Sequence, residues 1–172
     1  MKGYDIIGNI AIVKFGRDDS ALKNKKEAKK LLNEQKSIST VLEKTQGFKG
    51  RLRTLKSKYI AGIKTKEVLY NENGCVFRFN VDTCYFSPRL SSERLEIAKM
   101  IKKGENVLVM FGGVAPYAIV IAKKSIVKKI ISIELSRACN KYALENIKRN
   151  KVSDRVELIQ GDVRRVIPKL KE

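Results

Sequence analysis

Two acidic residues and a glycine pair follow apolar stretches in the second half of the chain. Gly112-Gly113 come just after the run Val107–Met110, Glu134 ends a second run, and Asp162 follows a third. A glycine pair lets the backbone turn sharply and approach a ligand, because no Cβ stands in the way. An acid about 20 residues later can accept hydrogen bonds from both hydroxyls of a ribose, and Asp162 can accept one from an adenine amino group.

Each of these signals also has an ordinary structural explanation. A glycine pair can form a plain strand-to-helix loop, and acids often end strands. The chain has no G-x-G-x-x-G or P-loop pattern for gripping phosphate, so a dinucleotide or ATP is disfavoured. S-adenosylmethionine carries a nucleoside and no phosphate. It is therefore the cofactor that the combination favours.

A parallel sheet would bring these loops together, and the hydrophobic pattern from Asn106 onward predicts one. Short apolar runs alternate with helical stretches: runs at 107–110, 129–134 and 156–160, and helices at 117–123, 137–149 and from 163. This βαβαβ order is typical of a Rossmann-like α/β sheet with right-handed crossovers. The uncharged run at 107–110 is typical of a strand covered on both faces. In the helix at 137–149 we expect these residues to face inward: Ala138, Tyr142, Leu144 and Ile147.

The part before this sheet is predicted to be an α+β module with mostly antiparallel strands. A strand pair around Gly8-Asn9, a basic helix at 23–35 and a hairpin at 67–79 are expected. Gln46–Arg53 is interpreted as a glycine-rich basic loop, either a solvated turn or a contact to phosphate or base. A helix should follow Pro88, with Ser91 or Ser92 as its cap. The predicted domains are a basic RNA-binding module at 1–84, a linker and helix at 85–104, and the N-terminal half of a Rossmann-like, cofactor-binding domain at 105–172.

Composition narrows the function further. The 172 residues carry 37 Lys+Arg against 18 Asp+Glu, a net charge of +19, which favours a polyanionic partner such as nucleic acid. The chain has no His, so acid–base work falls to Asp, Glu, Lys, Tyr or Cys, and His-ligated metal sites are excluded. Three Cys without metal-type spacing indicate reduced thiols, no metal and a cytoplasmic protein. No apolar run approaches the ~20 residues of a membrane span.

Two strings in the chain resemble signatures of one enzyme family. Tyr85–Arg94 reads YFSPRLSSER, and Met110–Tyr117 reads MFGGVAPY. Both are similar to the archaeal and eukaryotic tRNA (guanine-37 N1) methyltransferases and their wybutosine-pathway relatives, and the resemblance begins at about Tyr4. In that family a small basic module precedes a class I methyltransferase domain. The resemblance implies S-adenosylmethionine-dependent methylation of N1 of guanosine 37, just 3′ of the anticodon of tRNA.

The resemblance also implies roles for individual residues. Glu93 would be the general base that takes the N1 proton, Arg51 would stabilise the negative charge developing on the guanine O6, and Tyr85 would help position base and cofactor. Without the resemblance, Glu93 is explained by helix-start electrostatics and the cations by solvation. The predicted RNA contacts are Lys49, Arg51, Arg53 and Arg89. The resemblance implies cofactor contacts by Arg94, Phe111, Glu134 and Asp162, and the predicted cofactor site also includes Gly112, Gly113, Val114, Ala115, Pro116, Leu135 and Val163.

The sequence departs from the family pattern in several places. Val109 stands where an Asp is usual, and Ala115 stands where a second glycine is usual, which is a mild change if its φ is negative. We expect the fourth strand and its Asn-Leu-Pro-Pro-like loop to lie outside the 172 residues, so a complementary C-terminal half-domain is a predicted partner. Two alternatives remain open: transfer of the aminocarboxypropyl group from the same cofactor, and a non-catalytic tRNA-binding subunit.

Overall fold

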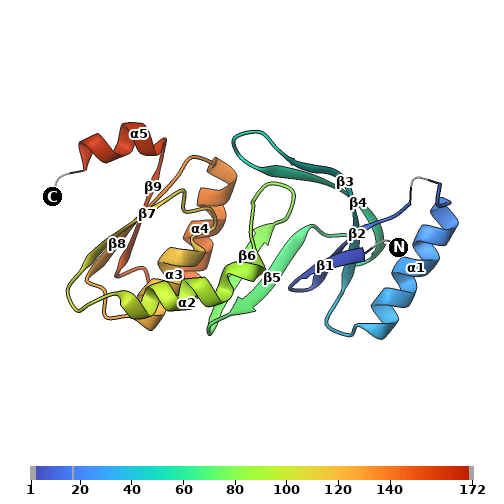
Figure 1. Ribbon diagram of the computed structural model, residues 1–172, viewed down its shortest axis with the longest axis horizontal. Coiled ribbons are helices and arrows are strands. Elements are labelled where there is room, and N and C mark those ends of the chain that lie inside the picture. Colours follow the sequence, from blue (N-terminus) through green and yellow to red (C-terminus); the bar gives the residue numbers. More distant parts are fainter. Residues whose placement is uncertain (1–2, 17, 171–172) are drawn as a thin grey trace. The chain divides into compact units, whose positions relative to one another are not determined.

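A computed structural model describes residues 3–16 and 18–170 (Figure 1), and the chain divides into two compact units. The first unit contains the described residues up to Tyr70 together with Asn80–Tyr85. The second contains Asn71–Phe79 and the described residues from Phe86 onward. The tip of the predicted hairpin, Asn71–Phe79, therefore belongs to the second unit.

The first unit is a helix packed on a four-stranded sheet of order β1-β2-β3-β4. β2 and β3 are parallel and the other pairs antiparallel, so α1 serves as the crossover that a parallel pair requires. Ala28 and Leu31 of α1 are buried against the sheet, and the Ser20 side chain caps the helix by accepting from Lys23 N at 3.2 Å. The elements are β1 (Gly3–Ile7), β2 (Ile10–Lys14), α1 (Ala21–Glu34), β3 (Thr40–Lys49) and β4 (Thr54–Gly62).

The basic loop predicted at Gln46–Arg53 is mostly strand. β3 pairs with β4 as far as Lys49, with register shifts near Gln46, and only the turn from Gly50 to Arg53 is irregular. Arg53 N donates to Gly50 O at 3.1 Å, and both residues have positive φ, 68° for Gly50 and 49° for Arg53. The prediction was wrong because a glycine in a local sequence pattern indicates a turn. Pairing with β4, together with a bulge, keeps Gly47 in the strand.

The predicted hairpin is confirmed. β5 (Glu67–Glu72) and β6 (Cys75–Asn80) form a two-stranded sheet, and the turn residues Asn73 and Gly74 both have positive φ. Two positive φ values are what the tight turns of two-residue hairpins require.

The second unit contains the predicted parallel βαβαβ sheet, of order β7-β8-β9. β7 lies at one edge of this sheet, and its Leu108 and Met110 are 42% and 50% exposed, so the expectation of a strand covered on both faces was wrong. The elements are η1 (Pro88–Leu90), α2 (Ser91–Met100), β7 (Asn106–Met110), α3 (Pro116–Lys124), β8 (Lys129–Glu134), α4 (Arg137–Arg149), β9 (Val156–Gln160), α5 (Val163–Val166) and η2 (Ile167–Lys169), where η marks a 3₁₀-helix.

The side chains of Asn146 in α4 and of Asn150, which caps the C-terminal end of α4, bond to the backbone of the hairpin strand β6 as a neighbouring strand would. Asn150 accepts from Val76 N at 2.9 Å and donates to Val76 O at 2.7 Å. Asn146 accepts from Arg78 N at 2.8 Å and donates to Arg78 O at 3.1 Å. These bonds satisfy backbone groups of β6 and explain why the hairpin tip belongs to the second unit.

The face of α4 that is buried differs in part from the predicted one. Ile147 faces inward as expected, but Leu144 is 49% exposed. The buried residues of α4 are Cys139, Asn140, Ala143, Asn146 and Ile147. An apolar pattern alone could not place Asn146, because its buried amide is satisfied by backbone groups of β6, which lie far away in the sequence.

Candidate active site

The glycine loop after β7 is held against the end of β8. Gly112 N donates to Ile133 O at 2.8 Å, and a Cβ on Gly112 would lie 2.2 Å from the hydroxyl oxygen of Ser132. Only glycine fits this close approach. The Glu134 carboxylate ties the same loop to the start of α4, since Oε2 accepts from Gly113 N at 2.8 Å and Oε1 from Ser136 N at 2.7 Å.

Two residues of this loop adopt left-handed backbone conformations. Phe111 has φ 59° and is 75% exposed, and Ala115 has φ 65° at the N-cap of α3. Alanine in place of the usual glycine was expected to be a mild change if the φ of Ala115 were negative. The φ of Ala115 is positive, so this condition is not met. The left-handed conformation costs an alanine about 1 kcal/mol relative to glycine. Val114 and Ala115 are buried, and Pro116 occupies the first turn of α3, where its fixed φ is favourable.

The third loop lies beside the second. Gly161 N donates to Glu134 O at 2.9 Å, which joins the end of β9 to the end of β8. The Asp162 side chain caps α5 by accepting from Arg164 N at 3.0 Å. Val163 is buried and Leu135 is half-buried. The structure therefore brings the three predicted loops together, and it also gives Asp162 a capping function that the sequence analysis had not considered.

Glu93 lies in the first turn of α2 with an exposed side chain. The hydroxyl of Tyr117 donates to Glu93 Oε1 at 2.5 Å. Tyr117 is the second residue of α3, directly after the glycine loop. Burial, followed by the hydrogen bond and charge of Glu93, raises the pKa of Tyr117 to about 12. Sequence reasoning missed Tyr117 as a partner of Glu93, although it ends the MFGGVAPY string.

Arg94 is buried and forms an ion pair with Glu72 at the end of β5. Its Nε donates to Glu72 Oε1 at 2.5 Å, and its Nη2 donates to Glu72 Oε2 at 2.6 Å and to Ser87 O at 3.0 Å. The guanidinium also lies over the rings of Phe86 and Tyr117, 5.1 and 5.6 Å from their centroids. These contacts fix the first turn of α2, next to Glu93. The predicted contact of Arg94 with a cofactor stays a prediction, and Glu72 is a residue that the sequence analysis missed.

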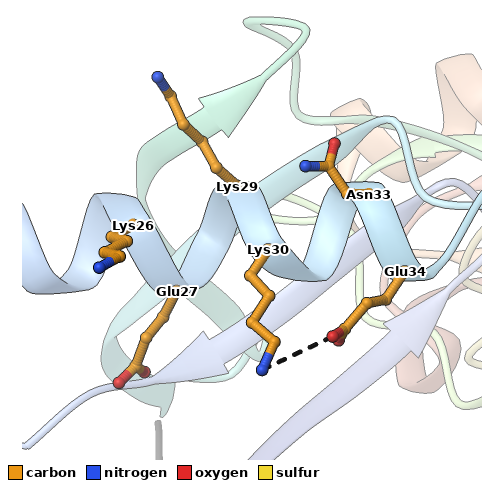
Figure 2. A pocket seen from close by; sticks show the side chains of 6 residues that line it. All are labelled: Lys26, Glu27, Lys29, Lys30, Asn33 and Glu34. Carbon is orange, nitrogen blue, oxygen red and sulfur yellow. Dashed lines mark ion pairs between the residues drawn. The ribbon is translucent and has the colours of Figure 1, made fainter.

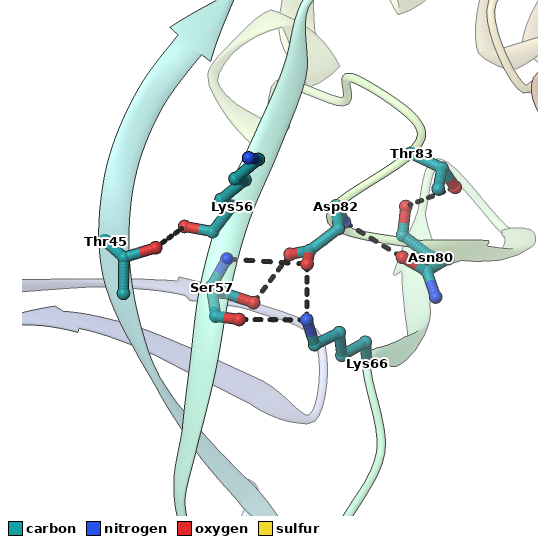
Figure 3. Close-up of polar contacts among 7 residues, drawn as sticks. All are labelled: Thr45, Lys56, Ser57, Lys66, Asn80, Asp82 and Thr83. Carbon is teal, nitrogen blue, oxygen red and sulfur yellow. Dashed lines mark hydrogen bonds and ion pairs between the residues drawn. The ribbon is translucent and has the colours of Figure 1, made fainter.

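In the first unit, a polar cluster around Asp82 holds the segment that leads to Tyr85 (Figure 3). Asp82 accepts from Ser57 Oγ at 2.6 Å and from Lys66 Nζ at 2.5 Å, and its carbonyl accepts from Leu55 N at 2.9 Å. These bonds attach the segment to β4 and the strand connection after it. The Arg53 guanidinium lies 4.2 Å from the centroid of the Tyr85 ring. The structure thus brings together one predicted RNA-binding residue and one predicted positioning residue.

The remaining predicted cations are exposed. Lys49 ends β3, Arg51 lies in the turn after it, and Arg89 lies in η1. Arg51 and Tyr85 belong to the first unit, whereas Arg89 and Glu93 belong to the second. Their predicted roles stay predictions.

A shallow hollow on α1 contains none of these residues (Figure 2). Lys30 and Glu34 pair across it at 3.7 Å, and both side chains are more than half exposed. Exposed pairs of this kind contribute little to stability, and the hollow is a solvated helix face. It is lined by Lys26, Glu27, Lys29, Lys30, Asn33 and Glu34.

Within residues 3–16 and 18–170, no three His, Cys, Asp or Glu side chains gather where they could hold a metal ion. Nor do these ranges contain a helix long and apolar enough to cross a membrane.

The three-stranded parallel sheet, with its loops at the carboxyl edge, defines the second unit as a Rossmann-like α/β fold. The model of the family described as "TRM5/TYW2 methyltransferase domain" matches residues 68–172. The chain belongs to this family.

Known proteins similar to the chain agree with this assignment. The tRNA (guanine(37)-N(1))/4-demethylwyosine(37)-methyltransferase Taw22 of Nanoarchaeum equitans is 44% identical over 159 residues, which cover 92% of this chain and 51% of the relative. The solved complex of aTrm5 and tRNALeu superposes with a TM-score of 0.86 at 27% identity, covering 95% of this chain and 48% of that one. M. jannaschii TYW2 in complex with AdoMet gives a TM-score of 0.67 at 26% identity, covering 94% and 57%. The chain therefore spans about half the length of the curated relatives it matches.

Proposed function

We propose that this protein uses S-adenosylmethionine to methylate N1 of guanosine 37 in tRNA, with Glu93 as the general base. One observation carries the proposal. Two hydrogen bonds meet at the glycine loop within the second unit. One links the loop to the carboxylate of Glu134, and the other links the carboxylate of Glu93 to Tyr117, the second residue of the helix that follows the loop. The sheet edge proposed to bind the nucleoside and the proposed general base are thus connected through the glycine loop and the first turn of α3. The chain belongs to the TRM5/TYW2 family.

The residues at the sheet edge fit a nucleoside cofactor. The Glu134 carboxylate accepts two backbone hydrogen bonds, and a carboxylate has about four lone-pair sites, so it can also accept from ribose hydroxyls. Gly112 keeps the loop backbone close to β8, where a side chain would clash. Asp162 offers an acceptor at the neighbouring loop, and the exposed ring of Phe111 offers an apolar surface to a purine.

The reaction needs a base, because N1 of guanine carries a proton. When bound, S-adenosylmethionine would supply an electrophilic methyl group for N1, with its thioether sulfur as the leaving group that keeps the electron pair. Glu93 takes the N1 proton onto its carboxylate. Arg51 stabilises the negative charge that the purine carries on O6 as the proton leaves. No histidine is required for either step.

The charge of the chain supports tRNA as the substrate. A net charge of +19 and the exposed Lys49, Arg51 and Arg89 suit a phosphate backbone. The structural neighbour described as the complex of aTrm5 and tRNALeu binds tRNA. The three cysteines are buried as thiols, which supports the cytoplasm as the location, where glutathione keeps thiols reduced.

Mass spectrometry of tRNA treated with the full-length gene product tests the proposal. We expect a gain of one methyl group on the purine 3′ of the anticodon. Glu93→Gln should lower the single-turnover rate by roughly 10²-fold or more. The matched control is Glu96→Gln, an exposed glutamate on the same helix, which should leave the rate unchanged. A fully active Glu93→Gln variant would remove Glu93 from the mechanism.

Transfer of the aminocarboxypropyl group is a second candidate, favoured by Val109, which stands near the end of β7 where the family pattern has an acid. The same mass measurement separates the two reactions, because that group is much heavier than a methyl group. A third candidate is a non-catalytic tRNA-binding subunit, favoured by the charge excess. It predicts tRNA binding without any binding of S-adenosylmethionine, which calorimetry would show.

We also propose that a complementary half-domain pairs with the open edge of β7. Among the described residues β8 is the strand paired with β7, which leaves the other edge of β7 open, and Leu108 and Met110 of this strand are exposed. Edges of this kind readily add a strand. Hydrogen exchange of the β7 amides should therefore be slower when the half-domain is added to residues 1–172 than in residues 1–172 alone, and equal rates would contradict the pairing.

A further inference from the structure

We propose that Tyr117 is a positioning residue that holds the carboxylate of Glu93 in the orientation needed to receive the N1 proton. This inference rests on the proposed function and extends it to a residue outside the predicted site. The hydroxyl of Tyr117 donates to Glu93 Oε1 at 2.5 Å. One carboxylate oxygen is thereby held, and Oε2 is left to accept the proton.

A glutamate on an exposed helix face would otherwise sample several rotamers. Glu93 is exposed, and fixing a long side chain in one orientation is entropically unfavourable unless a contact selects that orientation. Proton transfer requires the acceptor to lie within hydrogen-bonding reach in a defined geometry. The phenol supplies the selecting contact before any ligand arrives.

Tyr117 can do this because its own place is fixed. It follows Pro116 in the first turn of α3, whose neighbouring residues are buried. Its ring faces the guanidinium of Arg94 at 5.6 Å, and the Glu72 carboxylate holds that guanidinium in turn. A buried ion pair therefore supports the ring, while the hydroxyl reaches the exposed carboxylate. The phenol is a fixed donor and the glutamate is the movable partner.

The protonation state also suits a donor. Burial, the hydrogen bond to Glu93 and the charge of Glu93 together raise the pKa of Tyr117 to about 12, with a small opposing effect from Arg94. The phenol therefore keeps its proton at neutral pH. It donates to the carboxylate and does not compete for the proton of the substrate.

Single-turnover kinetics of the full-length gene product provide the first test. Tyr117→Phe, which removes only the hydroxyl, should lower the rate of transfer roughly tenfold, since a hydrogen bond to a charged group is lost. KM for tRNA and cofactor should change less than about twofold. The matched control is Tyr59→Phe, because the Tyr59 hydroxyl donates to a backbone carbonyl, that of Gly62, in the first unit. That control should leave the rate unchanged.

The double variant separates positioning from a structural role. If Tyr117 acts through Glu93, then Tyr117→Phe should cause no further loss in a Glu93→Gln background. An equal loss in both backgrounds, or no loss in the native background, would overturn the proposal. The proposed function would survive either result as long as Glu93→Gln alone is impaired.

Ultraviolet titration of the phenol gives a readout that is independent of activity. The ionisation of Tyr117 is obtained as the difference between the native chain and Tyr117→Phe, with circular dichroism to confirm that the fold persists. Glu93→Gln should move this ionisation to lower pH, because a charged acceptor is lost while burial remains. An unmoved ionisation would show that the hydrogen bond is absent in solution and would overturn the inference, whereas turnover of Glu93→Gln tests the base assignment by itself.

Discussion

The two candidate-site carboxylates of the second unit, those of Glu93 and Glu134, accept hydrogen bonds that hold them in place. Most cations predicted to contact RNA lie on exposed parts of the first unit. Glu134 accepts from two backbone N–H groups and Glu93 from a phenol. Lys49 and Arg51 are exposed at the end of β3 and in the turn after it. A carboxylate with a fixed orientation can recognise a ligand of defined geometry. A polyanion, in contrast, is attracted by positive charge whatever the orientation of the side chains that carry it. Substitutions should therefore act through geometry in the second unit and through salt-dependent attraction in the first.

The largest effect is expected from the buried pair that supports α2. Glu72→Gln leaves the Arg94 guanidinium buried without its counter-charge, so the free energy of unfolding should fall by roughly 3–5 kcal/mol. Glu157→Gln is the control, because it breaks an exposed pair with Lys129 in the same unit and should change stability by less than about 1 kcal/mol. Urea denaturation measures both. Equal losses would show that burial does not distinguish the two pairs.

The asparagine contacts to β6 should come next. Asn146→Ala removes the partners of both backbone groups of Arg78, and the free energy of unfolding should fall by about 2 kcal/mol. Lys148→Ala, at an exposed position of the same helix, should be nearly neutral. Amide exchange at Arg78 should accelerate only in the first variant. Protection that persists there would contradict the strand-like role of the asparagine.

A smaller, salt-dependent effect is expected in the first unit. Arg51→Ala should weaken tRNA binding by roughly fivefold at physiological salt and reduce the slope of log K against log[salt] by about one. Lys103→Ala, an exposed cation after α2, is the comparison. Binding isotherms at several salt concentrations measure both slopes. Indistinguishable slopes for the two variants would assign the attraction to net charge rather than to the turn after β3.

The smallest effect is a gain in stability. Ala115→Gly relieves the left-handed conformation at φ 65° and should raise the free energy of unfolding by roughly 0.5–1 kcal/mol. Ala118→Gly, inside α3, should lower it by about 1 kcal/mol, because glycine weakens a helix interior. Thermal unfolding distinguishes the two signs. A loss of stability in Ala115→Gly would show that its buried methyl group outweighs the backbone conformation.

The sequence predicted the parts of the fold that depend on local pattern. The βαβαβ order, the hairpin turn at Asn73-Gly74 and the three loops at one sheet edge are confirmed, because period, turn chemistry and strand direction are local properties. The extent of β3 was not predicted, since the pairing that keeps Gly47 in a strand comes from β4. The exposure of β7 was not predicted either, because it depends on which elements cover the sheet.

The candidate site was predicted less completely. The carboxylates could be placed at strand ends, but the partners that hold them could not. Tyr117 meets Glu93 across 24 positions of sequence, and Arg94 meets Glu72 across 22, so no local pattern encodes either contact. Asn146 and Asn150 look like surface residues in a helical pattern. They prove to be buried only because β6 presents unpaired backbone groups to them.

Titration of S-adenosylmethionine into the full-length gene product tests the central claim most directly, which is that the sheet edge around Glu134 binds the nucleoside of the methyl donor. Calorimetry should detect binding to the native protein, and Glu134→Ala should weaken it by roughly 10²-fold, since charge-assisted bonds to both ribose hydroxyls are lost. Glu157→Gln, on the neighbouring strand β9, should bind as the native protein does. Absence of binding to the native protein, or equal affinity in Glu134→Ala, would contradict the account.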